Sequence, residues 1–195
     1  MGTNMNNLYL FRAMEAYPWE LEKAIEALNY ALSYDPENAK ALCLMARVCW
    51  EQLGDYETAK SYYEKAIAAN INARFIYPDY IMVLINNSDL EEAQNLIDFA
   101  ETIKGIDLAS IKLQQGYLYE VQEDYEAAEK VLKQAKQLSM NNDFSFYVDD
   151  VLARIDKKRK EKNNNDRAKE REEKKEEENK ETSNSWFKNR LNSLL

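Results

Sequence analysis

Alanine recurs at a fixed interval along this chain. Two lines of four alanines are each spaced by 35, 34 and 35 residues, and a large apolar residue stands between the alanines of every pair. Because alanines seven residues apart return to the same side of a helix, each pair leaves room for a second helix to approach closely. The two lines are Ala24, Ala59, Ala93, Ala128 and Ala31, Ala66, Ala100, Ala135, with Leu28, Tyr63, Ile97 and Leu132 between them.

The boundaries between helices are marked by turn-forming residues. Asp55, Asp89 and Asp124 each stand just before an alanine-bearing segment, where a carboxylate can accept the first free backbone N–H groups of a helix. Tyr34 to Asn38 contains Pro36 and reads as a helix stop followed by a restart. Since the whole chain has only four glycines and three prolines, these signals predict a repeating unit of helix, tight turn, helix and short turn.

The motif carried by the second helix of each unit resembles that of the tetratricopeptide repeat family. Ala24, Leu28, Ala31 and Pro36 reproduce its spacing A-x₃-F-x₂-A-x₄-P, with leucine in place of phenylalanine. The first helices match more loosely, and the second unit carries one extra residue before Gly54. The resemblance implies an all-α fold, an α-solenoid of four helix-turn-helix repeats that ends in a capping helix and a charged tail.

The repeats cover residues 5–142 in this interpretation, and three further segments follow. We predict repeats at about 5–38, 39–73, 74–108 and 109–142, a capping helix at 143–156, a charged low-complexity spacer at 157–183 and a short amphipathic helix at 184–195. The capping helix follows from an apolar stripe, and the spacer from its near lack of apolar residues. Pairs of Glu and Lys four residues apart give the spacer partial helical, coiled-coil-like character.

In the tetratricopeptide family the first helices of successive repeats line a concave groove, so residues one repeat apart form rows across it. Three rows have steps of 35 residues: Arg47, Met82, Tyr117; Leu44, Asp79, Gln114; and Trp50, Ile85, Glu120. Aromatic, Met and Arg side chains concentrate binding energy in protein interfaces. The predicted peptide-binding residues are Tyr9, Arg47, Trp50, Met82, Gln114 and Tyr117.

The best-known ligand of the family is a chaperone C-terminal carboxylate, and the cationic clamp that binds it is absent from this sequence. Phe75 and Asp79 stand in place of the third-repeat cations, and Tyr9 and Ala13, or their neighbours, in place of the first-repeat Lys and Asn. The net charge is −9, and residues 1–155 alone carry −12. Such a surface disfavours nucleic acid and anionic membranes. We expect a protein or peptide partner that is apolar or basic, and the oligomeric state is left open.

Apolar residues return at the end of the chain. On a helix Phe187, Leu191, Leu194 and Leu195 share one face, the format of a short segment that docks in a hydrophobic groove. The predicted docking motif is Trp186, Phe187, Leu191, Leu194 and Leu195. Docking on a partner or a second copy is the preferred interpretation, ahead of packing on the chain's own repeats and of membrane contact.

Neither catalysis nor cofactor binding is predicted. The chain has no histidine, its adjacent carboxylates diverge on helices, and it has no glycine-rich phosphate loop or nucleophile elbow. Cys43 and Cys49 lie about 9 Å apart along one predicted helix, too far for a disulfide. We therefore expect no catalytic, cofactor or metal site and a cytoplasmic location. The leading hypothesis is a protein-binding adaptor, and the alternative is a structural or self-assembling subunit.

Overall fold

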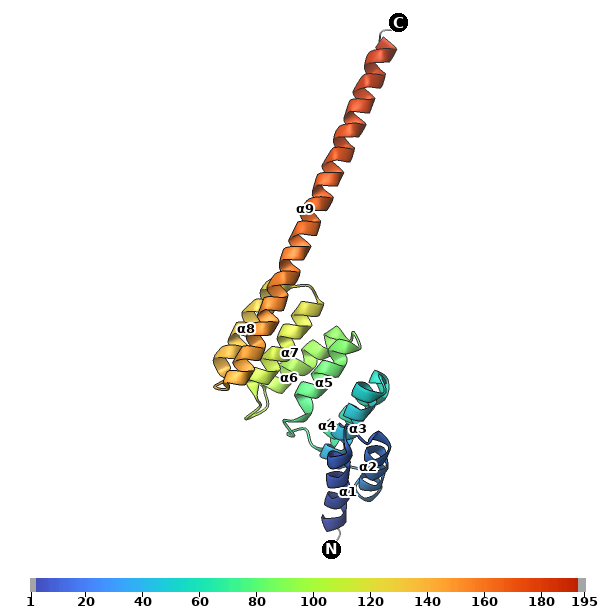
Figure 1. Ribbon diagram of the computed structural model, residues 1–195, viewed down its shortest axis with the longest axis vertical. Coiled ribbons are helices and arrows are strands. Elements are labelled where there is room, and N and C mark those ends of the chain that lie inside the picture. Colours follow the sequence, from blue (N-terminus) through green and yellow to red (C-terminus); the bar gives the residue numbers. More distant parts are fainter. Residues whose placement is uncertain (1–2, 193–195) are drawn as a thin grey trace. The chain divides into compact units, whose positions relative to one another are not determined.

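The computed structural model describes the backbone of residues 3–192 and the side chains of residues 8–167, 169, 171 and 172. The chain divides into two compact units, Met1–Val148 and Asp149–Leu195. The first unit is a succession of helical hairpins, which Figure 1 shows from blue at the N-terminus to yellow and orange at α8 and the start of α9. Within the described residues there is helix and turn but no strand, as the alanine pattern predicts.

Each predicted repeat is a hairpin of two helices. The pairs of helices within a repeat make the most extensive contacts between helices, as expected from two small surfaces around one large side chain. The hairpins are α1 (Thr3–Ala16) with α2 (Leu21–Tyr34), α3 (Ala39–Arg47) with α4 (Tyr56–Ala69), α5 (Ile76–Asn86) with α6 (Leu90–Glu101), and α7 (Leu108–Val121) with α8 (Tyr125–Leu138).

The two alanine lines lie in the core. All eight alanines, and the four large residues between them, have no exposed surface. At Gly116 of α7, an added Cβ would lie 2.6 Å from Leu132 Cδ2 of α8. Small residues at these places let helix axes approach, and the large residue between them fills the space, which confirms the predicted basis of the repeat.

The first helices of the repeats form the inner layer of the array. Contacts run in series from α1 to α3, from α3 to α5 and from α5 to α7, whereas no comparable contact joins successive second helices in the described part of the chain. In a curved stack, the layer whose members touch one another is the concave one. The inner side of the first unit is therefore lined by side chains of α1, α3, α5 and α7.

The turn inside each of the last three repeats has the same conformation. Gly54, Ser88 and Glu123 adopt φ of 67°, 67° and 59°. Asp55 and Asp124 then cap the next helix, each accepting a backbone N–H at 3.0 Å as predicted. The φ > 0 residue ends one helix and reverses the chain, and the aspartate starts the next.

The prediction for Asp89 is wrong in its detail. This aspartate stands at the N-cap position of α6, but its carboxylate accepts no backbone N–H there. It is bound by Lys60 Nζ at 2.6 Å and by the Asn87 side-chain amide at 2.8 Å. A charge-assisted bond to an ammonium is stronger than a bond to a backbone amide, so the lysine of the preceding repeat takes the carboxylate.

The extra residue of the second repeat is absorbed in a π-helical turn. Val48–Gln52 continues α3 with π-helical hydrogen bonding, and the N–H of Asp55 donates to the carbonyl of Cys49, six residues back, at 2.9 Å. The equivalent bonds in the third and fourth repeats span five residues, from Asp89 to Leu84 and from Asp124 to Tyr119. A single inserted residue is thus accommodated without lengthening the loop.

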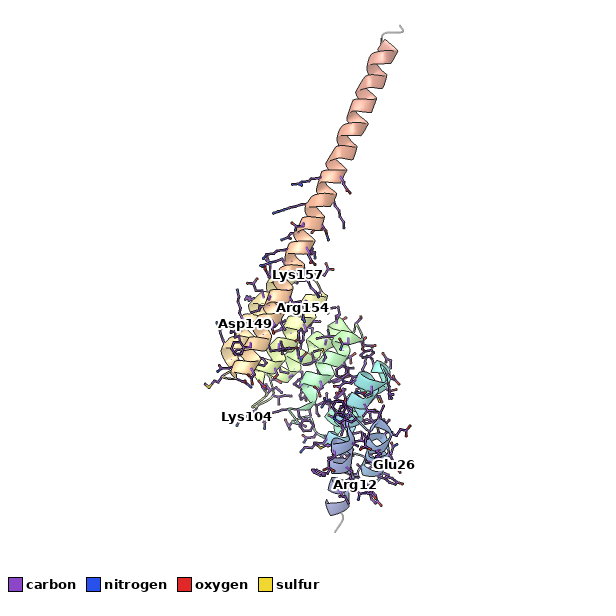
Figure 2. The ribbon with its side chains drawn as sticks, viewed as in Figure 1. Arg12, Glu26, Lys104, Asp149, Arg154 and Lys157 are labelled. Carbon is purple, nitrogen blue, oxygen red and sulfur yellow. The ribbon has the colours of Figure 1, made fainter. Side chains whose placement is uncertain are left out.

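Helix α9 (Asn142–Asn192) begins in the first unit and provides the described part of the second. The predicted capping helix, spacer and C-terminal helix are consecutive stretches of this one helix as far as Asn192. Ion pairs one turn apart occur along it, for example between Lys160 and Asp156 at 2.5 Å. In the second unit Asp149, Arg154 and Lys157 project from its surface (Figure 2). The sequence predicts only partial helical character for the spacer, whereas the structure has one continuous helix through it.

Candidate protein-binding face

One residue on each first helix takes an equivalent place on the inner layer. Ala13, Ala46 and Ile81 have no exposed surface and Gly116 is buried, so each faces the core. The residue that follows each of them is at least partly exposed. We call these four residues the inner ladder: Met14, Arg47, Met82 and Tyr117.

Arg47 connects three consecutive repeats on this layer. Its guanidinium lies over the ring of Tyr17, 5.5 Å from the ring centre, and its Nε lies 3.8 Å from a carboxylate oxygen of Asp79 on α5. The same Nε donates to Glu51 at 3.2 Å, and the Tyr17 hydroxyl also donates to Glu51. Burial, together with the bond to Glu51, raises the pKa of Tyr17 to about 12. Since these groups are partly exposed, their main effect is to fix side-chain orientation rather than to add stability.

The carboxylate of Asp79 is in an unfavourable environment. Partial burial raises its pKa above the ordinary value, while the nearby Arg47 acts in the opposite direction and Glu51 raises it further. A second carboxylate brought to this place would meet two existing ones, Asp79 and Glu51, that share a single arginine. The middle of the inner ladder therefore disfavours an acidic ligand.

At the end of the ladder Tyr117 meets the first turns of α9. Its hydroxyl is hydrogen-bonded to the hydroxyl of Tyr147 at 2.5 Å, which holds both rings on the inner side of the first unit. Gln114, one turn earlier on α7, is only 9% exposed, and its amide oxygen is buried without a hydrogen-bond partner among the described residues. Tyr117 is therefore partly exposed beside Tyr147, whereas the Gln114 oxygen is enclosed.

Trp50 has a different environment from that predicted by its spacing. It belongs to the π-helical turn, is half-buried, and packs against the core shared by the second to fourth repeats. Its indole Nε1 is buried without a partner of normal geometry in the described part of the chain. The inserted residue lies in this turn, so the position equivalent to Ile85 is Glu51 and not Trp50. Glu51 stands 34 residues before Ile85, the same distance that separates Asp55 from Asp89.

Tyr9 packs within the first repeat. Its ring stacks on Tyr30 and Tyr34 of α2, with ring centres 5.1 Å and 5.9 Å apart. The structure thus brings Arg47, Met82 and Tyr117 to equivalent places on one layer and assigns the fourth place to Met14, which is 58% exposed. Sequence reasoning missed Met14 because Ala13 precedes Ala46 by 33 residues rather than 35. The only sequence feature that could have indicated Met14 is the small residue before it, Ala13. Ala16 is an equally good candidate for that small residue, so the choice could not be made from sequence.

The predicted C-terminal docking motif lies outside the described residues. The side chains of Trp186, Phe187 and Leu191 are not among those described, and Leu194 and Leu195 fall outside entirely. Of the remaining chain, residues 8–167 with 169, 171 and 172, no group of three or more Cys, Asp or Glu is placed to hold a metal ion. No helix in that part is both long and apolar enough to cross a membrane.

Comparison with known proteins gives the family. A sequence model described as "Tetratricopeptide repeat" matches residues 39–70 and 109–142, which are the second and fourth hairpins. The chain contains tetratricopeptide repeats. The matched segments end within a few residues of the predicted repeat boundaries, and the first and third hairpins carry the same buried alanines. No curated protein matches the chain.

Solved structures resemble this chain in fold. PilF of Pseudomonas aeruginosa aligns with a TM-score of 0.69 at 19% identity, over 82% of this chain and 71% of PilF. PilW, a type IV pilus biogenesis factor, aligns with a TM-score of 0.64 at 19% identity, over 76% of this chain and 70% of PilW.

A third structure, TTC0263, a tetratricopeptide repeat protein of Thermus thermophilus, aligns with a TM-score of 0.63 at 21% identity, over 77% of this chain and 80% of TTC0263. At these identities the likeness establishes the fold alone. Tetratricopeptide repeats in general hold other proteins, and the fold is that of a protein-interaction adaptor.

Proposed function

We propose that this protein is an adaptor that holds an apolar or basic peptide or helix of a partner protein along its inner ladder. The observation that supports this most directly is the row Met14, Arg47, Met82 and Tyr117, one at least partly exposed side chain from each repeat on a single layer. Two methionines, an arginine and a tyrosine are adaptable or anchor-type residues in interfaces. No catalytic step is part of the proposal.

The character of the partner follows from charge. The first unit contains 23 acidic and 12 basic residues, and Asp79 is already disfavoured as an anion beside Glu51. An acidic peptide would add to this repulsion, whereas a basic or apolar one would not. We propose a reducing compartment, the cytoplasm, because Cys43 and Cys49 are buried free thiols.

The proposal is tested by selecting peptides from a random display library on the full-length chain. Selected peptides should be apolar or basic, and Met82→Ala or Tyr117→Ala should weaken them by about tenfold each, since truncated anchor residues cost about 1–2 kcal/mol. Met140→Ala is the matched control, because Met140 is fully exposed outside the inner layer. Peptides that bind both ladder variants as well as wild type would overturn the assignment of this face.

A further inference from the structure

The first helix carries an apolar surface that the described part of the first unit leaves uncovered. Leu8, Phe11 and Met14 follow one another at three-residue steps along α1 and are 45%, 58% and 58% exposed. We call these three residues the α1 patch. Phe11 stands two residues before Ala13, as Leu44 stands two before Ala46, and Leu44 is only 8% exposed. The place that is covered in the second repeat is therefore open in the first.

We propose that the α1 patch is the docking site for the C-terminal segment, residues 184–195, of a second copy of this chain. This inference rests on the proposed function, since the patch shares Met14 with the inner ladder and the segment is named as its occupant. The segment has the needed chemistry: Phe187, Leu191 and Leu194 recur at steps of four and three residues, and Lys188 and Arg190 supply two positive charges. Apolar anchors at these steps are the format of a helix laid on a hydrophobic surface.

Charge around the patch complements that of the segment. The hairpin α1–α2 carries a hollow lined in part by Glu15, Glu20 and Glu26 together with Arg12 and Lys23. Arg12 on α1 and Glu26 on α2 are labelled in Figure 2. Glu20 is paired with Lys23, but Glu15 and Glu26 have no ion pair within the described part of the chain. Glu15 stands one turn after Phe11 on α1, so a carboxylate without an ion pair in the described part of the chain lies beside the patch, which suits a segment with two cations beside an apolar face.

Helix α9 carries the segment at its far end. The helix is unbroken to Asn192, and from Asp149 to Trp186 it rises about 55 Å. A segment at the end of so long a helix can be presented to a second copy. The contact joins different surfaces of two copies, so each copy offers one α1 patch and one segment.

Mixing two defective variants of the full-length chain tests this directly. Phe11→Ser with Met14→Ser removes the patch, and Phe187→Ser with Leu191→Ser removes the segment. In sedimentation velocity, wild type should associate as concentration rises. Each variant should be monomeric at concentrations at least tenfold higher, because truncated anchors weaken binding by about that factor. An equimolar mixture should form a one-to-one complex, since one intact patch then meets one intact segment.

Controls separate this contact from others. Phe11 and Met14 are exposed, so the patch double variant should keep the wild-type circular dichroism and melting temperature. Met140→Ser removes a still more exposed methionine elsewhere and should leave association unchanged. A labelled peptide of residues 184–195 should bind the segment variant and fail to bind the patch variant.

Three results would overturn the inference. The first is a wild type that stays monomeric at every concentration. The second is association that survives in the patch variant, which would indicate contact between two α9 helices. The third is a peptide that binds both variants equally. None of these depends on Met82 or Tyr117, so peptide selection on the inner ladder can still succeed and the proposed function can stand alone.

Discussion

Gly116 and Leu132 are in such close contact that the effect of changing one on the free energy of unfolding should depend on the other. A Cβ at position 116 would lie 2.6 Å from Leu132 Cδ2 and 2.7 Å from Cγ, about 1 Å inside the usual separation of carbon atoms. Leu132 has no exposed surface and cannot turn aside freely. Overpacking of this kind costs about 2 kcal/mol, while replacing glycine by alanine inside a helix gains about 1 kcal/mol. Gly116→Ala should therefore lower the free energy of unfolding by about 1 kcal/mol.

The double variant should reveal the contact as a coupling energy. Leu132→Ala alone should cost about 3 kcal/mol through lost burial and a cavity. In that background the new methyl group meets no leucine, so Gly116→Ala should stabilise by about 1 kcal/mol. The double variant should then lose about 2 kcal/mol where simple addition gives about 4, a coupling of about 2 kcal/mol.

Urea unfolding followed by circular dichroism measures all four proteins. Ala46→Gly, at the equivalent place in α3, is the control and should cost about 2 kcal/mol through helix propensity and the loss of a buried methyl group. If the effects of Gly116→Ala and Leu132→Ala add within about 0.5 kcal/mol, the close approach of α7 and α8 is not what requires glycine here.

Other residues allow further tests of stability. Ser88→Gly should raise the free energy of unfolding by about 0.5 kcal/mol and Gly54→Ala should lower it by about 1 kcal/mol, because both positions need φ > 0. Calorimetry in which both variants change stability in the same direction would contradict this. Asp79→Asn should stabilise at neutral pH, since burial raises the pKa of Asp79 in the fold, and the gain should vanish as pH falls to about 4, where the carboxyl is protonated. Lys60→Met should lower the free energy of unfolding above pH about 4, because Lys60 lowers the pKa of Asp89. As pH falls further, Asp89 is protonated and the stability difference between wild type and variant should shrink. A stability difference that stays constant in acid titrations would refute this.

The inner layer shows where sequence reasoning stops. Arg47, Met82 and Tyr117 follow from the sequence because a repeat of constant length carries equivalent residues to equivalent places. Met14 does not, because the first repeat differs in length by two residues at that point, and Trp50 leaves the predicted row because the π-helical turn carries it toward the core. One inserted residue rotates a helical position by about 100°, which is enough to change its neighbours.

Asp89 shows the same limit for polar contacts. Its position before a helix predicts a cap, and the carboxylate does stand there, but Lys60 lies 29 residues earlier in sequence and binds it from another helix. Partners at that separation are set by how the hairpins stack, which no local motif encodes. The same holds for the bond between Tyr117 and Tyr147 across 30 residues.

The sequence by itself determined the helices, their pairing and the number of repeats. It could do so because the spacing of small and large residues along a helix decides which side can be buried, and this requirement is local and repeats. Only the tertiary structure decided which side chains lie on the inner layer, which carboxylates form ion pairs and which apolar surface on α1 is exposed. Those outcomes depend on the relative rotation and stacking of separate helices, in which a shift of one residue exchanges a buried side for an exposed one.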